Sequence, residues 1–152
     1  MLNRSAHLLR RLLALTPRER ATLYASTALL PLFWLALRAL GLQRLHTLIL
    51  RRPLLTMQQP APAEDLARLV NTAARHVPFG ANCLTRSLLL LWLLRRRGIA
   101  GDLRIGVRLE QGVLHAHAWV ECDGVPVNDN PDVGRDFASF DQPIPAWAFQ
   151  SR

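Results

Sequence analysis

The sequence contains no lysine and only two cysteines in its 152 residues. All nineteen basic residues are arginine, a bias typical of genome composition, so the arginines alone do not indicate a recognition code. Two cysteines are too few for a disulfide scaffold, and Arg10 and Arg11 interrupt the N-terminal leucines where a signal peptide would be apolar. We therefore expect a cytoplasmic protein in which Cys83 and Cys122 are not joined by a disulfide.

Acidic residues are also scarce in one part of the chain. Residues 1–56 carry nine arginines against the single acid Glu19, whereas residues 57–152 carry ten arginines against ten acids. This uneven distribution differs from the uniform basic footprint of a nucleic-acid-binding domain, so nucleic acid is not an expected partner. The sequence also lacks a phosphate-binding glycine loop, and it requires no cofactor.

A proline-rich stretch at residues 56–63 marks a change in both charge and hydrophobicity, which predicts a linker. It divides the chain into a basic, leucine-rich helical segment, residues 1–56, and a second domain, residues 57–152.

The N-terminal segment carries helical signals along its length. Residues 4–15 predict a short basic amphipathic helix. Thr16, Pro17 and Glu19 then form a capping box with proline at the first helical position, which marks the start of a second helix. Residues 41–52 predict a further basic helix.

The uncharged run at residues 21–37 raises the question of a membrane span. It falls just short of the roughly 20 apolar residues that a span requires, and Pro31 would kink it. We expect residues 17–40 to belong to a helical hairpin that packs on the rest of the protein or on a partner. A membrane span and a helix lying on the membrane surface stay open as alternatives.

The second domain is predicted to be α+β. An amphipathic helix over residues 64–77 precedes an apolar helix that begins at Cys83. After Gly98 the apolar residues recur with a period of two, which indicates antiparallel strands joined by hairpin loops. The aromatic residues beyond 136 have no clear period and predict an irregular stretch over the core. The predicted strands cover residues 103–109, 113–121 and 125–129.

Cys83 is the candidate nucleophile because of its place at the start of a helix. Asn82 is a preferred N-cap residue, and the helix behind Cys83 is apolar nearly all round as far as Leu94. Three arginines and Gly98, which suits a C-terminal cap, then end it. The helix dipole and the free first-turn amides would stabilise a thiolate there. The alternative of a small, buried, unreactive cysteine stays open from this stretch alone.

A histidine and an aspartate can be paired across the last hairpin. His117 lies on a predicted strand, and Gly124 suits the third place of a three-residue loop that begins at Cys122. That loop would set His117 opposite Asp129 on one face of the sheet. A two-residue turn would instead shift the register by one and move Asp129 to the other face.

Cys83, His117 and Asp129 would supply a nucleophile, a base and a residue that orients the base, as covalent acyl transfer requires. The backbone N–H of Cys83 is expected to serve as one oxyanion donor. His115 shares the strand face of His117 and could be the base instead. These four side chains could alternatively bind zinc, although no closely spaced Cys-x-x-Cys pair supports a metal site.

Three motifs occur together in a specific order and spacing. They are Asn-Cys-Leu-Thr-Arg-Ser-Leu at 82–88, Ala-His-Ala-Trp-Val-Glu at 116–121 and Asn-Asp-Asn-Pro-Asp-Val at 128–133. Over about residues 57–145 the chain thereby resembles the lasso peptide biosynthesis B proteins. The resemblance implies a papain- or transglutaminase-like core, in which a helix with an N-terminal cysteine packs on an antiparallel sheet.

The same resemblance implies an activity. It is that of a cysteine peptidase that removes the leader from a ribosomally made lasso peptide precursor, with Cys83, His117 and Asp129 as its triad. Another Cys-His-Asp acyltransferase, such as a transamidase, stays an alternative, as does a catalytically silent adaptor that binds the leader or the membrane.

The resemblance also implies partners. Fused members of the family carry a winged-helix-like leader-binding domain, which needs strands, whereas residues 1–56 show only helical pattern. The chain therefore resembles the split form, in which a separate leader-recognition protein presents the precursor peptide. Residues 1–56 could dock that protein, the asparagine-synthetase-like cyclase that closes the ring, or the membrane surface. Stimulation by ATP is implied by the resemblance alone.

Overall fold

The computed structural model of the chain describes residues 15–51, 62–77 and 81–139. The predicted helix over residues 4–15, except Leu15, and the aromatic tail beyond residue 139 lie outside these ranges. In chain order the elements are helices α2 (Pro17–Arg51), α3 (Ala63–Ala74) and α4 (Cys83–Arg96), strands β1 (Asp102–Glu110), β2 (Val113–Cys122) and β3 (Val125–Pro126), helix α5 (Val133–Asp136) and strand β4 (Ala138–Ser139).

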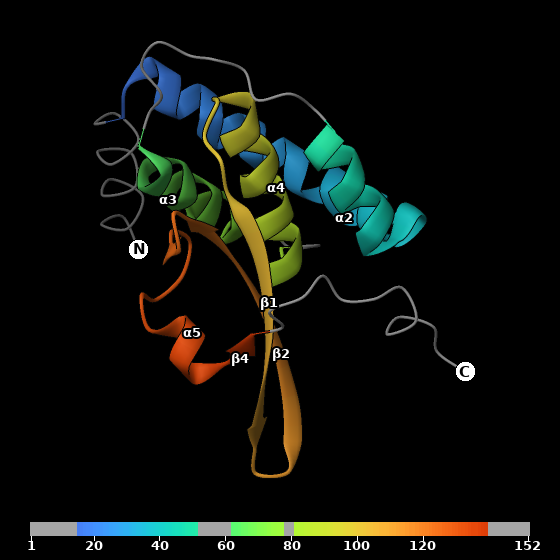
Figure 1. The fold of residues 1–152 in the computed structure, drawn as a ribbon. Coiled ribbons are helices and arrows are strands. Elements are labelled where there is room, and N and C mark those ends of the chain that lie inside the picture. Colours follow the sequence, from blue (N-terminus) through green and yellow to red (C-terminus); the bar gives the residue numbers. More distant parts are fainter. Residues whose placement is uncertain (1–14, 52–61, 78–80, 140–152) are drawn as a thin grey trace, which may run out of the picture.

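Helix α4 lies at the centre of the fold (Figure 1). It packs against α2 and α3 on one side and against β1 and β2 on the other. The four strands form an antiparallel sheet in the order β3-β2-β1-β4. This arrangement confirms the predicted α+β class with a helix-on-sheet core. The aliphatic core between the layers includes Leu30, Leu66, Val70, Leu88, Leu91, Leu94 and Val120.

Helix α2 begins at the predicted capping box. Glu19 Oε2 accepts the Thr16 N–H at 2.8 Å, and the Glu19 N–H donates to Thr16 Oγ1 at 3.2 Å. Pro31 lies within the helix, and the break in helical geometry falls at Gly41, where φ is 77°. The chain turns back at that point, so the two parts of α2 form a hairpin (Figure 1).

Both ends of α4 follow the local signals in the sequence. Asn82 Oδ1 accepts the Thr85 N–H at 2.8 Å, which confirms the predicted N-cap. At the other end Gly98 takes the left-handed conformation, with φ of 75°. The Ile99 N–H donates to the Leu94 carbonyl at 3.0 Å, as in a Schellman cap. Cys83 is therefore held in the first turn of a helix with two defined ends.

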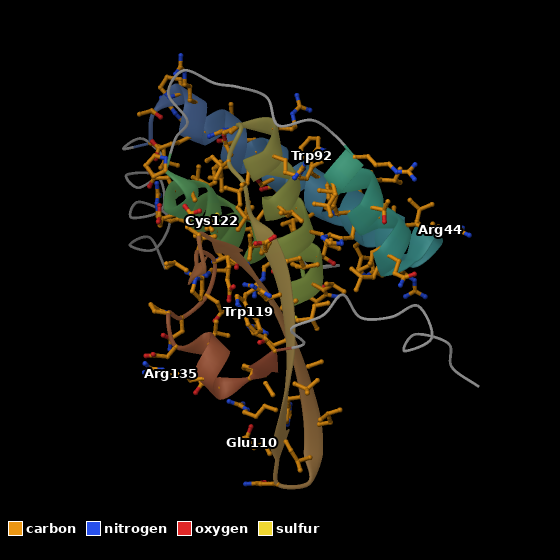
Figure 2. All side chains as sticks on the ribbon, in the orientation of Figure 1. Arg44, Trp92, Glu110, Trp119, Cys122 and Arg135 are labelled. Carbon is orange, nitrogen blue, oxygen red and sulfur yellow. The ribbon has the colours of Figure 1, made fainter. Side chains whose placement is uncertain are left out.

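Strands β1 and β2 form a long hairpin that projects from the body of the protein, with Glu110 near its tip (Figure 2). Glu110 pairs directly with Val113 across a two-residue turn. Both turn residues, Gln111 and Gly112, have positive φ, as a type I′ turn requires. The register sets Gly106 of β1 opposite His117 of β2.

The predicted register of the second hairpin is wrong. Cys122 pairs with Val125 across a two-residue turn, because both Asp123 and Gly124 adopt positive φ, at 51° and 78°. Aspartate tolerates this left-handed conformation, so the type I′ turn replaces the expected three-residue loop. The predicted strand over 125–129 is also too long, since β3 ends at Pro126.

Candidate active site

Asp129 reaches His117 although the ladder register would not bring it there. Continued pairing would set residue 129 opposite Ala118, with its side chain on the other face. The chain instead leaves the ladder after Val127, whose N–H still donates to the Val120 carbonyl at 3.0 Å. Asp129 Oδ2 then lies 2.7 Å from His117 Nε2. The predicted pair is present, but a bend in the chain produces it.

A buried asparagine holds this bend in place. Asn128 is 6% exposed, and its Oδ1 accepts the Val120 N–H at 2.8 Å. Its Nδ2 donates to Ser87 Oγ at 3.0 Å, and its carbonyl accepts from Asn71 Nδ2 at 3.0 Å. The side chain of Asn128 therefore joins the loop that carries Asp129 to both α4 and β2, while its carbonyl joins it to α3.

Ser87 connects the cysteine-bearing helix to the histidine-bearing strand. Its hydroxyl donates to the Ala118 carbonyl at 3.0 Å, and Ala118 directly follows His117. Cys83 precedes Ser87 by four residues and so lies on the same side of α4, one turn closer to the helix start. Its side chain is half-buried and free of any disulfide. The first turn of α4 is thus directed toward the part of β2 that carries His117.

Aromatic rings fix the orientation of the imidazole. The His117 ring stacks on Trp119 at a centroid distance of 6.2 Å and lies 5.0 Å from the ring of Phe137. Gly106, opposite His117, makes room for these rings. A Cβ atom there would lie 2.9 Å from Phe137 Cβ and 3.0 Å from Trp119 Cη2. Any side chain at this position would displace the neighbours of the imidazole.

Trp119 is itself fixed by a polar chain. It is fully buried, and its indole N–H donates to Glu121 Oε1 at 2.9 Å. The other carboxylate oxygen of Glu121 accepts from Arg104 Nε at 2.9 Å. The indole N–H of Trp119, on which the His117 ring stacks, therefore has a hydrogen-bond acceptor. Figure 2 shows Trp119 within the body of the protein.

The other candidate ligands and bases lie elsewhere. His115 is exposed, two residue pairs further toward the hairpin tip, and pairs with Arg108. Within residues 15–51, 62–77 and 81–139, no three His, Cys, Asp or Glu side chains form a group suited to a metal ion. The zinc alternative therefore has no support from the described part of the chain.

Cys122 differs from Cys83 in its surroundings. It lies at the end of β2, half-buried against the aliphatic core. Burial raises the pKa of the Cys122 thiol, and the carboxylates of Asp123, Glu64 and Asp102 raise it further. This cysteine is suited to packing rather than to nucleophilic attack.

The arrangement leaves one imidazole nitrogen available for chemistry. With Nε2 of His117 donating to the Asp129 carboxylate, Nδ1 is the nitrogen left to accept a proton. A carboxylate in this position fixes the tautomer of the ring and stabilises its protonated form. His117 can therefore act as a general base whose ring is oriented by the Asp129 carboxylate.

Several residues of the site were not predicted from the sequence. Ser87 is a polar residue one turn after Cys83 and directly before the leucine run of the helix, and that position could have identified it. Glu121 follows Trp119 by two residues on the same strand face, which is also a readable signal. Asn128, Gly106 and Phe137 act through contacts with distant parts of the chain and have no comparable local signal.

Comparisons with known proteins identify the family of the chain. A sequence profile of the transglutaminase-like superfamily matches residues 28–140. A stretch of 55 residues is 40% identical to the microcin J25-processing protein McjB of Escherichia coli, covering 36% of this chain and 26% of that protein. No solved structure shows a significant match. The McjB match supports the resemblance to lasso peptide B proteins, and the profile confirms that the chain belongs to the transglutaminase-like superfamily.

Proposed function

We propose that the protein is a cysteine peptidase that removes the leader peptide from a lasso peptide precursor. In this proposal Cys83 is the nucleophile, His117 the base and Asp129 the residue that orients the base. The observation that carries it is the 2.7 Å contact of His117 Nε2 with Asp129 Oδ2, on a strand tied through Ser87 to the helix that begins at Cys83. The superfamily and the partial McjB similarity support peptide processing as the task.

The reaction starts with transfer of the Cys83 proton to Nδ1 of His117. The thiolate attacks the carbonyl carbon of the scissile peptide bond, and the displaced electron pair moves to the carbonyl oxygen. The imidazolium donates its proton to the leaving nitrogen as the C–N bond breaks. The leader is then a thioester on Cys83, and the core peptide leaves with a free amine.

Hydrolysis of the thioester completes the cycle. His117, neutral again, removes a proton from water, and the resulting hydroxide attacks the thioester carbonyl. The C–S bond breaks, the leader leaves as a carboxylate, and the thiol of Cys83 is restored. The Asp129 carboxylate holds the imidazole through both stages and stabilises its cationic form.

The start of α4 is suited to the oxyanion of this reaction. The Thr85 N–H is taken by the Asn82 side chain, and the Arg86 N–H donates to the Asn82 carbonyl. The Cys83 N–H precedes both in the first turn, where helix amides point out of the helix start. We propose it as one oxyanion donor.

We further propose the division into residues 1–56 and 57–152, a cytoplasmic location and the split form of the system. A separate leader-recognition protein would present the precursor peptide, and the cyclase would act on the released core. The hairpin of α2 lies against α3 and α4 and so forms a layer beside the proposed peptidase domain. No cofactor is needed for the steps above.

A processing assay tests the proposal. The full chain is incubated with a lasso precursor peptide and its leader-recognition protein, and the products are weighed by mass spectrometry. We expect a leader with a free carboxylate and a core peptide with a free amine, and no products with Cys83→Ala. The Cys122→Ala variant is the matched control and should cleave normally. Absence of cleavage by the wild-type chain, or cleavage by Cys83→Ala, would contradict the proposal.

The same assay separates hydrolysis from amine transfer. An added primary amine competes with water for the thioester, and a transamidase would convert the leader into its amide. We expect the carboxylate product to dominate at millimolar amine. If cleavage depends on His115 rather than on His117, the base is misassigned, and paired His115→Ala and His117→Ala variants decide this.

A further inference from the structure

The first part of α2 presents an apolar face to solvent. Tyr24, Ala28, Leu32, Leu35 and Ala39 follow one another at helical spacing and fall within about 80° of arc. Tyr24, Leu32 and Leu35 are 62%, 57% and 53% exposed. We call these five residues the outer face of α2. An apolar row of this length on a water-facing helix indicates a contact surface.

The opposite side of the same helix is already in use. Leu23 is 7% exposed and Leu30 is fully buried, and both belong to the core shared with α3 and α4. Arg97 Nη2 also donates to Thr22 Oγ1 at 2.8 Å, and Arg68 Nη2 to Glu19 Oε1 at 2.8 Å. By length and composition α2 could cross a membrane. If α2 spanned a membrane, its contacts with α3, α4, Arg97 and Arg68 would be lost. A membrane could therefore contact α2 in this fold only through its outer face.

The charges around the outer face have one sign. Glu19 is the single acid in α2, and it is held by Thr16 and Arg68. The exposed charged residues of the helix are all arginine: Arg18, Arg38, Arg44 and Arg51. Figure 2 shows Arg44, which follows the break at Gly41, near the outer corner of the α2 hairpin and away from the sheet. The surface that complements this helix therefore combines an apolar layer with negative charge.

Aromatic side chains complete the pattern. Tyr24 belongs to the outer face, and Trp34, in the same part of α2, has the Arg38 guanidinium 5.2 Å from its ring centre. Tyrosine and tryptophan favour the boundary between hydrocarbon and headgroups, where one end of the ring is apolar and the other wet. An apolar row bordered by arginines is typical of helices that lie in that boundary.

We propose that the outer face of α2 binds the surface of an anionic lipid bilayer, with the helix lying parallel to the membrane plane. Leu32 and Leu35 enter the acyl boundary, and the exposed arginines contact lipid phosphates. The rest of the fold stays on the water side. This inference is independent of the proposed peptidase activity, since it uses no residue of the candidate site.

Vesicle sedimentation tests the proposal with the full chain. We expect binding to vesicles of phosphatidylcholine and phosphatidylglycerol at 3:1, at least about tenfold stronger than to phosphatidylcholine alone, and weakened by salt. Leu35→Glu should reduce binding at least about tenfold, because it places a charge in the acyl boundary. Leu109→Glu is the matched control: Leu109 is 70% exposed but lies on the hairpin, and its substitution should leave binding unchanged.

A second variant tests the charges separately. Replacing Arg38 and Arg44 by glutamine should lower binding to the anionic vesicles while leaving the weak binding to phosphatidylcholine as it was. Failure to bind anionic vesicles would overturn the proposal, as would equal losses in Leu35→Glu and Leu109→Glu. If the chain instead forms a dimer that Leu35→Glu dissociates, and does not bind vesicles, the outer face contacts a second copy of the chain. That result would also overturn the proposal.

Discussion

Helices α2 and α4 are both rich in leucine, yet their leucines lie in opposite environments. Leu88, Leu89, Leu90, Leu91 and Leu94 of α4 are all fully buried, whereas Leu32 and Leu35 of α2 are more than half exposed. The cause is their neighbours: α4 is enclosed by two helices and two strands, while α2 packs mainly on α3 and α4. Leucine content predicts a helix in both places, and the surrounding elements decide whether it is buried.

The two helices also differ in how they are attached. α4 is joined to β2 and to the Asp129 loop by the buried side chains of Ser87 and Asn128. α2 is held mostly by aliphatic packing, with polar contacts such as Arg97 to Thr22. Substitutions around α4 should therefore affect chemistry and stability strongly, and comparable substitutions in α2 should have smaller effects.

The largest effect is expected at Asp129. Replacement by asparagine keeps the shape but removes the charge that fixes the His117 tautomer, so cleavage should fall by about 10²–10⁴-fold. The readout is kcat in the processing assay, with circular dichroism as a check of folding. Asp132→Asn, an exposed carboxylate in the same loop, is the control and should cleave normally. Equal losses in both variants would remove the special role of Asp129.

Asn128→Ala should have the largest effect on stability. It leaves the buried Val120 N–H without its partner and removes the hydrogen bond that Ser87 Oγ accepts, at a cost of about 2–4 kcal/mol in urea unfolding. The comparison within α2 is Ser26→Ala. Ser26 is buried, and its hydroxyl has no hydrogen-bond partner in the described part of the chain. Its loss should change stability by less than about 0.5 kcal/mol. Similar costs at both positions would break the contrast between the helices.

Gly106→Ala should act through crowding. The new Cβ would meet Phe137 Cβ at 2.9 Å and the Ala138 carbonyl at 3.1 Å, so we expect a cost of about 1–3 kcal/mol together with slower cleavage. Gly134→Ala in α5 is the control, because its Cβ would meet nothing within 4 Å. That variant should be neutral or slightly more stable. Normal cleavage by Gly106→Ala would show that the aromatic neighbours of His117 can shift freely.

Thr16→Ala should have a moderate effect on α2. It removes the side-chain half of the capping box at the helix start, which costs about 1 kcal/mol in thermal or urea unfolding. Thr47→Ala, at an exposed position within the same helix, is the control and should change little. A loss much above this value would mean that the Thr16 side chain does more than cap the helix.

The smallest effect concerns pH. Burial lowers the pKa of His46, Arg95 lowers it further, and Asp102 partly opposes this. The native state then binds a proton less readily than the unfolded state, so this stability is present above pH 6.5 and is lost as pH falls below it. Between pH 7 and 5 the melting temperature should fall less steeply in His46→Gln than in the wild-type chain. Identical slopes would contradict the assignment.

The sequence predicts the start of α4 well because its signals are local. Asn82 caps the helix by accepting the N–H of Thr85, three residues later, and Gly98 ends it by adopting positive φ. Neither signal needs a partner from a distant part of the chain. The same holds for Thr16 and Glu19. Where a structure depends on residues within one turn, the residues themselves identify it.

The contact of His117 with Asp129 was predicted for the wrong reason. Asp-Gly suits both a two-residue and a three-residue hairpin, and the sequence does not choose between them. The structure has the shorter turn, and a bend held by Asn128 restores the contact. The partners of that asparagine lie 41 and 57 residues away in the chain, at Ser87 and Asn71, and no local pattern reveals them. Long-range polar contacts are the part that the sequence alone does not supply.

The raised pKa of Cys122 has a practical consequence for chemical labelling. A protonated thiol reacts slowly with alkylating reagents, and burial adds to this at the end of β2. Cys83 sits in the first turn of α4 and is likewise half-buried, but only the Cys122 thiol has the neighbouring carboxylates that raise its pKa further. We therefore expect a limiting dose of iodoacetamide to alkylate Cys83 and to leave Cys122 largely unmodified. A fluorophore or covalent inhibitor could then be attached at Cys83 of the unaltered protein, without first removing its second thiol.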